Sequence, residues 1–387
     1  MAQLPFIMVR NQVEISHFPE GRAVCKKIFV AATGQQCGKT TTSIALLHMA
    51  RKKYRRVGFM KPLGPKPTIF RGRWVDQDAA LLAKIYGLED DLDYMSPVVL
   101  QPNSTRQILD RKIAAKQLEQ ELLQAARELK KRCDLLIIEG AGHSGVGSVV
   151  GLNNARMARL LDAPILMVTD AGIGRVVDNV HLNLALFRQE QADLRLLLVN
   201  KLLPDKRQRT MGYLQQAFAD MPFKVAAGFD FSPILANPTL KHIAKLLNVY
   251  LKGKQGAEHS IVHHVQLGAA STQRVHDLLE DSSLLIVTST RNELLVTLAS
   301  LYNIPEYRHK IAGLVIPGLF PISKVTQQIL DRSQIPYMRA ESHSSAEVFS
   351  AIANDVAKIN AEDREKISLL QTLAETDLDF EAIDGLF

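Results

Sequence analysis

The sequence predicts an α/β fold in which a doubly wound, mostly parallel sheet is followed by a smaller α/β domain. Between residues 26 and 252, short strands that are apolar throughout alternate with amphipathic helices, a pattern typical of parallel strands buried on both faces. A polar, glycine-containing break follows at Leu251–Ser260, and strand-helix alternation then resumes on a smaller scale. The length of 387 residues is also sufficient for two domains.

The elements of the first domain can be predicted in order along the chain. Its strands are predicted from the segments KIFVAAT, RVGFMKP, DLLIIEG, APILMVTD and LRLLLVNK. Helices are predicted between these strands, including Asp78–Tyr86 and Gln107–Arg132. Ligands of such sheets bind beyond the carboxyl ends of the strands, and polar residues cluster at those ends here.

The second domain repeats the pattern with the strands IVHHVQLGA, SSLLIVTST, IAGLVIPG and IPYMRAE. A helix follows each strand, and the last helix is predicted over Ser344–Ile359. The tail is acidic and helix-prone, and the pattern leaves open whether it packs on the body or on a partner. We therefore predict an extension at 1–25, a first domain at 26–252, a linker at 253–260, a second domain at 261–359 and a tail at 360–387.

Composition excludes several classes of protein. The net charge is +7, but the basic residues are scattered, with short bursts at Arg51–Arg56 and Lys130–Arg132 and only 6% aromatic residues, so we expect no nucleic-acid partner. Cys25, Cys37 and Cys133 form no CxxC pair, which argues against a disulfide framework or a zinc site and favours the reducing cytoplasm. No run of eighteen apolar residues occurs, so neither membrane spanning nor export is expected.

The segment IFVAATGQQCGKTTTSIALL combines an apolar strand, a glycine-containing turn and a helix. Gly38, Lys39 and Thr40 match the end of the pattern G-x-x-x-x-G-K-[ST], whereas Thr33 occupies the position of the first glycine and Gly34 follows it. In this pattern amides and the lysine bind phosphates, and the hydroxyl binds Mg²⁺. The alternative is a simple corner between strand and helix. The residues predicted to bind ATP are Gly34, Gln35, Gln36, Cys37, Gly38, Lys39, Thr40 and Thr41, the last reaching the α-phosphate.

A second motif, CDLLIIEGAG, ends an apolar strand with Glu139. A carboxylate there can face Mg²⁺ directly or through water. The alternative role is that of a capping group. Because the two motifs belong to one kind of site, each strengthens the other.

These motifs, with GFMKP, DQDAALL and LLLVNK, resemble the dethiobiotin-synthetase-like P-loop ATPases over most of residues 26–252. More closely, the chain is similar to the amino-terminal region of long bacterial phosphotransacetylases, in which such a P-loop NTPase domain precedes a DRTGG domain. By this resemblance Lys61 faces the substrate or the γ-phosphate, and Asn200 contacts the base. Lys61 could instead be a solvated charge at the end of a strand.

The resemblance also implies a metal site. Asp78 joins Thr40 and Glu139 around Mg²⁺, and Asp76 is a further candidate. Alternatively, Asp78 caps a helix that begins at Ala79.

The second domain resembles the DRTGG domain but departs from its name-giving residues. Thr290-Arg291 stands where that domain has an aspartate-arginine pair, and Pro317-Gly318 stands at its threonine-glycine-glycine turn. The segment QLGAAS at 266–271 resembles the start of that domain. The resemblance implies regulation or dimerisation, so we expect a homo-oligomer that forms through this domain.

Three functions follow as hypotheses. The first is a Mg²⁺-dependent ATPase that controls a metabolic partner, with Lys39, Glu139 and Lys61 as catalytic residues. The second is an ATP-dependent ligase that activates a small carboxylate or carbamate substrate, and the third is a non-catalytic nucleotide sensor. Acetyl transfer is not expected, because the acetyltransferase region that follows these domains in the long enzymes does not occur in this sequence.

Overall fold

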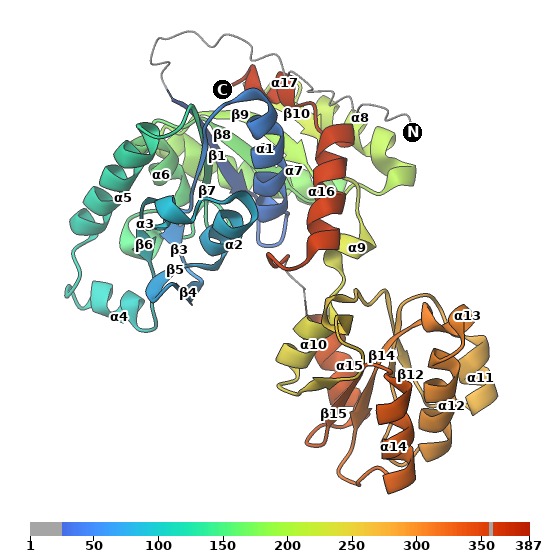
Figure 1. Ribbon diagram of the computed structural model, residues 1–387. Coiled ribbons are helices and arrows are strands. Elements are labelled where there is room, and N and C mark those ends of the chain that lie inside the picture. The colour runs from blue at the N-terminus through green and yellow to red at the C-terminus, as the bar shows by residue number, and fades with distance from the viewer. Residues whose placement is uncertain (1–24, 356–358) are drawn as a thin grey trace, which may run out of the picture.

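The computed structural model, which describes residues 25–355 and 359–387, contains a six-stranded parallel sheet (Figure 1). The sheet order is β10-β9-β8-β1-β7-β2. The chain leaves β1 toward β2 on one side and later adds β8 on the other, so β1 lies at the point where the strand order reverses. The strands are β1 (Lys26–Ala32), β2 (Val57–Met60), β7 (Leu135–Glu139), β8 (Ile165–Thr169), β9 (Leu194–Val199) and β10 (Lys224–Ala227).

The sheet has helices on both faces (Figure 1). Its central strands β7 and β8 are therefore buried along their whole length. The predicted doubly wound α/β fold is therefore confirmed. The predicted extension 1–25 lies outside the described residues except for Cys25. The main covering helices are α1 (Lys39–Lys53), α2 (Gln77–Tyr86), α5 (Ala115–Lys130), α6 (Asn154–Leu160), α7 (Ile173–Gln189) and α8 (Arg207–Ala217).

Short elements fill the segment between β2 and α5. They are β3 (Leu63–Gly64) paired with β6 (Val98–Val99), the antiparallel pair β4 (Pro67–Phe70) and β5 (Arg73–Asp76), and the helices α3 (Leu92–Met95) and α4 (Ser104–Leu109).

The prediction of one helix over Gln107–Arg132 is wrong. The chain breaks after α4, where Arg111 takes a left-handed φ of 59° and the amide of Lys112 donates to the carbonyl of Gln107 at 2.8 Å. This closure ends α4 in the manner of a helix C-terminal cap. The turn allows both Ile108 and Ile113 to pack against the core.

A second, five-stranded sheet has the order β11-β15-β14-β13-β12 and is parallel except for β11. Helices α10 (Leu240–Leu246), α12 (Asn292–Tyr302), α14 (Lys324–Ser333) and α15 (Ser345–Asn354) pack around it, with α11 (Thr272–Asp277) at the edge (Figure 1). This is the smaller α/β unit that the alternation predicts. Its strands are β11 (Leu251–Lys252), β12 (His264–Leu267), β13 (Ser283–Ile286), β14 (Ile311–Pro317) and β15 (Tyr337–Ala340).

The predicted domain boundaries remain predictions, but the contacts of the linker segment are informative. The amide of Lys254 donates to the carbonyl of Gln334 at 3.0 Å, and Ala257 is buried in the core of the second unit. Helix α10 belongs to that core as well. Residues 253–260 thus pack within the second unit, and the chain crosses between the units before Leu240.

The tail returns to the first sheet. Helix α16 (Arg364–Asp377) runs beside α1 (Figure 1), and α17 (Phe380–Asp384) follows it. Leu370, Ala374 and Phe380 are buried in the core of the first unit. Of the two predicted alternatives, the tail therefore packs on the body.

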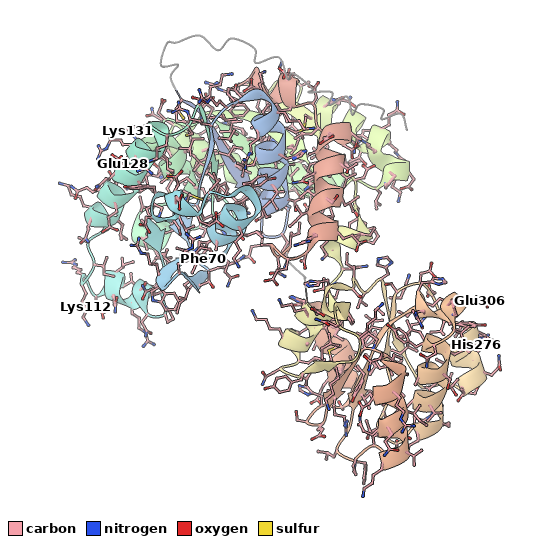
Figure 2. The ribbon with its side chains drawn as sticks, viewed as in Figure 1. Phe70, Lys112, Glu128, Lys131, His276 and Glu306 are labelled. Atoms are coloured by element: carbon pink, nitrogen blue, oxygen red, sulfur yellow. The ribbon has the colours of Figure 1, made fainter. Side chains whose placement is uncertain are left out.

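The two basic bursts are largely paired with acidic residues. Lys131 lies 2.7 Å from Glu128, and both side chains are on the outside of the molecule at α5 (Figure 2). Arg132 lies 2.7 Å from Asp91. In the other burst Lys52 lies 2.6 Å from Glu375 of the tail. Within the described residues, no helix has both the length and the hydropathy to cross a membrane.

We predict that Asp384→Asn destabilises the docked tail. The Asp384 carboxylate accepts from Tyr54 at 2.6 Å and lies 2.9 Å from Lys53 and 3.3 Å from Lys26. Burial alone would raise the pKa of Asp384, but these hydrogen bonds outweigh it and lower that pKa below 3.8. The free energy of unfolding should fall by about 2 kcal/mol.

Urea unfolding at several pH values measures this loss. Because the pKa of the folded state is lowered, the difference between wild type and variant should persist from neutral pH down to 3.8 and narrow only below it. The control is Glu381→Gln, which removes an exposed carboxylate of the same helix and should change stability by less than about 0.5 kcal/mol. An equal loss in both variants would contradict the assignment.

Candidate functional site

The loop between β1 and α1 requires glycine at one position. Gly38 has a φ of 99°, and a Cβ added there would lie 2.1 Å from the side-chain nitrogen of Asn200. Thr33, at the position of the first glycine of the pattern, has no left-handed φ. Its hydroxyl instead bonds Thr169 of β8 at 3.0 Å. The threonine therefore fits because the backbone at that position does not need glycine.

Lys39 lies over this loop. Its ammonium donates to the carbonyl of Gly142 at 2.8 Å and to that of Gly34 at 3.3 Å. Burial, reinforced by repulsion from Lys61, lowers the pKa of Lys39 to about 8. A partly desolvated cation that donates to carbonyl groups is suited to bind an anion.

A buried cluster of charges lies beside the loop. The Lys61 ammonium donates to Asp78 at 2.8 Å, to Glu139 at 2.7 Å and to the carbonyl of Gly140 at 3.2 Å. Burial alone would lower the pKa of Lys61, but the Glu139 and Asp78 carboxylates outweigh it and hold that pKa above its usual value. Lys61 is thus not the solvated strand-end charge of the alternative interpretation.

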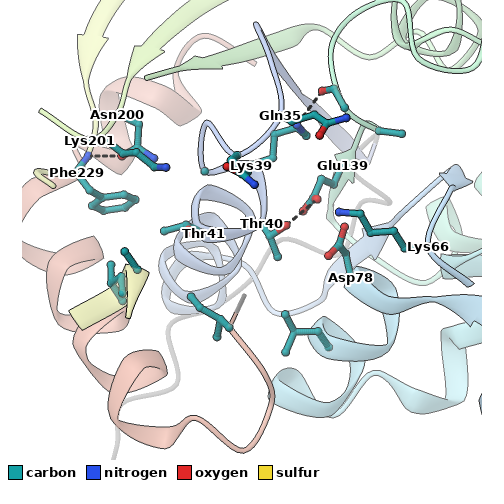
Figure 3. A pocket seen from close by; sticks show the side chains of 18 of the residues that line it. Gln35, Lys39, Thr40, Thr41, Lys66, Asp78, Glu139, Asn200, Lys201 and Phe229 are labelled. Carbon is teal, nitrogen blue, oxygen red and sulfur yellow. Dashed lines mark hydrogen bonds between the residues drawn. The ribbon is translucent and has the colours of Figure 1, made fainter. Parts of the chain in front are cut away.

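The same cluster contains the predicted magnesium ligands. The Thr40 hydroxyl donates to Glu139 Oε1 at 3.0 Å (Figure 3), whereas Glu139 Oε2 is buried and has no hydrogen-bond partner among the residues that the structure describes. Asp78 accepts from the same Lys61 ammonium that donates to Glu139. The described residues contain no group of three or more His, Cys, Asp or Glu that could hold a metal unaided. Two carboxylates and a hydroxyl nevertheless suit Mg²⁺, which takes its other ligands from phosphates and water.

Asp76 has a different position from Asp78. Its carboxylate accepts from the amide of Asp78 at 2.8 Å and from that of Lys66 at 3.2 Å, so Asp76 caps α2. The alternative in which Asp78 caps a helix from Ala79 is therefore wrong, because α2 begins two residues earlier. Burial raises the pKa of Asp76 to about 6.

Asn200 connects two parts of the site. Its side-chain nitrogen donates to the carbonyl of Cys37 at 3.1 Å, and its oxygen accepts from the amide of Phe229 at 3.1 Å (Figure 3). One amide thereby ties the loop to the segment that follows β10.

These residues surround a cavity of about 400 Å³. Gly34 and Cys37 belong to the loop but do not line the cavity; the Cys37 thiol is buried, 3.6 Å from the Thr33 hydroxyl. The predicted residues that line it are Gln35, Gln36, Gly38, Lys39, Thr40, Thr41, Lys61, Asp78, Glu139 and Asn200.

Sequence reasoning missed one wall of the cavity. It is formed by residues 229–232, Leu235 and Ala236 after β10, together with Ile359. The position of this segment beyond the carboxyl end of a parallel strand is the signal that could have identified it. No motif marks Ile359, because only the folded chain brings it to the pocket.

The sheet, the loop before α1 and the carboxylate at the end of β7 define a P-loop nucleotide-binding protein. The family model described as AAA domain matches residues 26–239, more than half of the sequence, so the chain belongs to this family.

Individual relatives agree with the resemblance of the sequence. Phosphate acetyltransferase of Synechocystis sp. is 22% identical over 75% of this chain and 41% of its own length. The ATP-dependent dethiobiotin synthetase of Aromatoleum aromaticum is 29% identical over 38% of this chain and 65% of its own. The chain thus spans less than two thirds of either relative.

Among the solved structures that are similar to part of the chain is one that contains a DRTGG domain. The CBS and DRTGG domains of the regulatory region of Clostridium perfringens pyrophosphatase, complexed with diadenosine tetraphosphate, share 15% identity. The match covers 34% of this chain and 57% of that chain with a TM-score of 0.23.

We predict that Lys61→Met destabilises the fold, since it leaves the buried Asp78 and Glu139 without their ammonium partner. The free energy of unfolding at neutral pH should fall by roughly 3 kcal/mol.

Chemical denaturation at neutral pH tests this expectation. Lys66→Met is the matched control, because Lys66 is an exposed lysine of the same pocket. Its stability should stay within about 0.5 kcal/mol of wild type. A Lys61→Met protein as stable as this control would refute the role of the buried cluster.

Proposed function

We propose that the chain binds ATP with Mg²⁺ in this cavity and hydrolyses it. The observation that carries the proposal is the contact of the Thr40 hydroxyl with Glu139, whose second oxygen is buried and accepts no hydrogen bond from the described part of the chain. Membership of the AAA domain family supports the same reading.

The chain's own residues would share the work as follows. The loop amides and Lys39 would bind the β- and γ-phosphates and offset the negative charge that spreads over the transferred group. Thr40, Glu139 and Asp78 would hold Mg²⁺, which supplies further charge neutralisation when bound. Lys61, kept protonated by its two carboxylates, would add positive charge near the γ-phosphate.

The second unit would regulate this cycle and mediate self-association, and through it the chain would control a metabolic partner in the cytoplasm. The resemblance to the DRTGG domain supports a regulatory role. Exposed apolar side chains on that unit, including Leu319, Phe320 and Val325, support contact with a second copy.

Lys39→Ala should abolish most ATP hydrolysis, because an electrostatic donor to the transition state is lost. The expected cost is about 2.7–4 kcal/mol in the barrier, or roughly a hundredfold to a thousandfold in turnover. Phosphate release is measured beside Lys112→Ala, an exposed lysine on the first unit (Figure 2) that should behave as wild type.

Unchanged turnover in Lys39→Ala would defeat the assignment of this lysine. If the wild type binds ATP tightly but releases no phosphate, the result would favour the third hypothesis, a non-catalytic nucleotide sensor.

A second candidate is a ligase that activates a small carboxylate or carbamate with ATP. Two observations favour it. The relative from Aromatoleum aromaticum is a dethiobiotin synthetase. In addition, Pro65, Leu81 and Val146 line the cavity together with Lys61, and an acceptor could bind among them.

For the ligase we expect a diamino or carboxylate metabolite to raise the rate of phosphate release above its basal value. The measurement is a screen of small acids in a phosphate-release assay, with the Lys39→Ala protein as the blank. If none of the acids stimulates release, basal hydrolysis alone remains.

A further inference from the structure

The first crossing between the two units is short. At the start of the crossing, the amide of Phe231 donates to the carbonyl of Leu202 at 2.7 Å, and this bond fixes the crossing to the nucleotide-binding unit. On the other side the amide of Val262 donates to the carbonyl of Pro238 at 2.9 Å, which ties it to the second unit. Only residues 232–237 separate these two hydrogen-bonded ends, and they include α9 (Pro233–Ala236).

This crossing is also a wall of the cavity. Phe231, Ser232, Leu235 and Ala236 line it, and Ile359, after the second unit, completes the same apolar region. Figure 3 shows Phe229, which leads into the crossing, on the opposite side of the loop helix from Asp78 and Lys66. The cavity therefore has a charged end for phosphates and an apolar end that suits a flat aromatic ring.

The wall is anchored to the nucleotide-binding unit at two points. At its start, Asn200 joins the amide of Phe229 to the carbonyl of Cys37 in the phosphate loop. At its end, the fully buried Lys366 of α16 donates to the carbonyl of Asn237. Helix α16 in turn packs along α1. A displacement of the crossing would therefore move both the phosphate loop and α1.

We propose that the purine base of the bound nucleotide rests against this crossing, so that occupancy of the pocket is coupled to the second unit. The inference rests on the proposed binding of ATP. A ligand that contacts the residues joining two units restricts the relative movement of those units. By linkage, if the nucleotide changes the affinity of the second unit for its own ligand by some factor, that ligand changes the affinity for the nucleotide by the same factor. The triphosphate alone, which lacks a base, would not reach the crossing.

The first test compares ATP with inorganic tripolyphosphate as ligands of Leu235→Asp. A carboxylate in the apolar wall should weaken ATP binding by roughly tenfold or more and leave tripolyphosphate binding unchanged. Leu278→Asp, which alters an exposed leucine of the second unit, should leave both affinities as in wild type. Equal affinity of Leu235→Asp and wild type for ATP would overturn the proposal.

The second test uses hydrogen exchange on the wild-type protein. A non-hydrolysable ATP analogue with Mg²⁺ should slow exchange in residues 33–42, in 229–237 and in α10, whereas tripolyphosphate should protect 33–42 alone. Protection confined to 33–42 with both ligands would leave ATP binding intact and sink the coupling. Protection nowhere would defeat the proposed function and this inference together.

Discussion

The site depends on the pairing of one buried ammonium with two buried carboxylates. Lys61 follows β2, Asp78 lies in the first turn of α2 and Glu139 ends β7, so the pairing brings three separate elements to one point. Because a buried charge that loses its partner costs several kcal/mol, none of these elements can shift alone. Thr40 extends the constraint to α1 through its hydrogen bond with Glu139.

The phosphate loop illustrates how a motif can change and keep its geometry. The pattern asks for glycine twice, but only Gly38 has a left-handed backbone that a side chain would strain. At the other position Thr33 uses its hydroxyl to bind Thr169, which fastens the start of the loop to β8. Threonine in place of glycine at position 33 thus gives up backbone freedom that this position does not use and adds a hydrogen bond. The amides of the loop can still face a phosphate.

The second unit is inserted into the first rather than appended to it. The chain leaves the nucleotide-binding unit after β10, forms the second sheet, and returns as α16 and α17 against α1. Asp384 closes this return, because its carboxylate collects hydrogen bonds from Lys26, Lys53 and Tyr54. Phe231, Ser232, Leu235 and Ala236 of the first crossing line the cavity, as does Ile359, which follows the second unit. Residues that connect the units therefore also belong to the binding site.

The sequence by itself determined the parallel sheet, the smaller α/β unit, the phosphate loop and the carboxylate at Glu139, because apolar strands and short motifs are local signals. Only the tertiary structure decided the break at Arg111, the docking of the tail and the apolar wall near Leu235. It also decided the partners of Lys61, since Glu139 lies 78 residues away along the chain. Such contacts depend on how distant segments pack, which no local periodicity encodes.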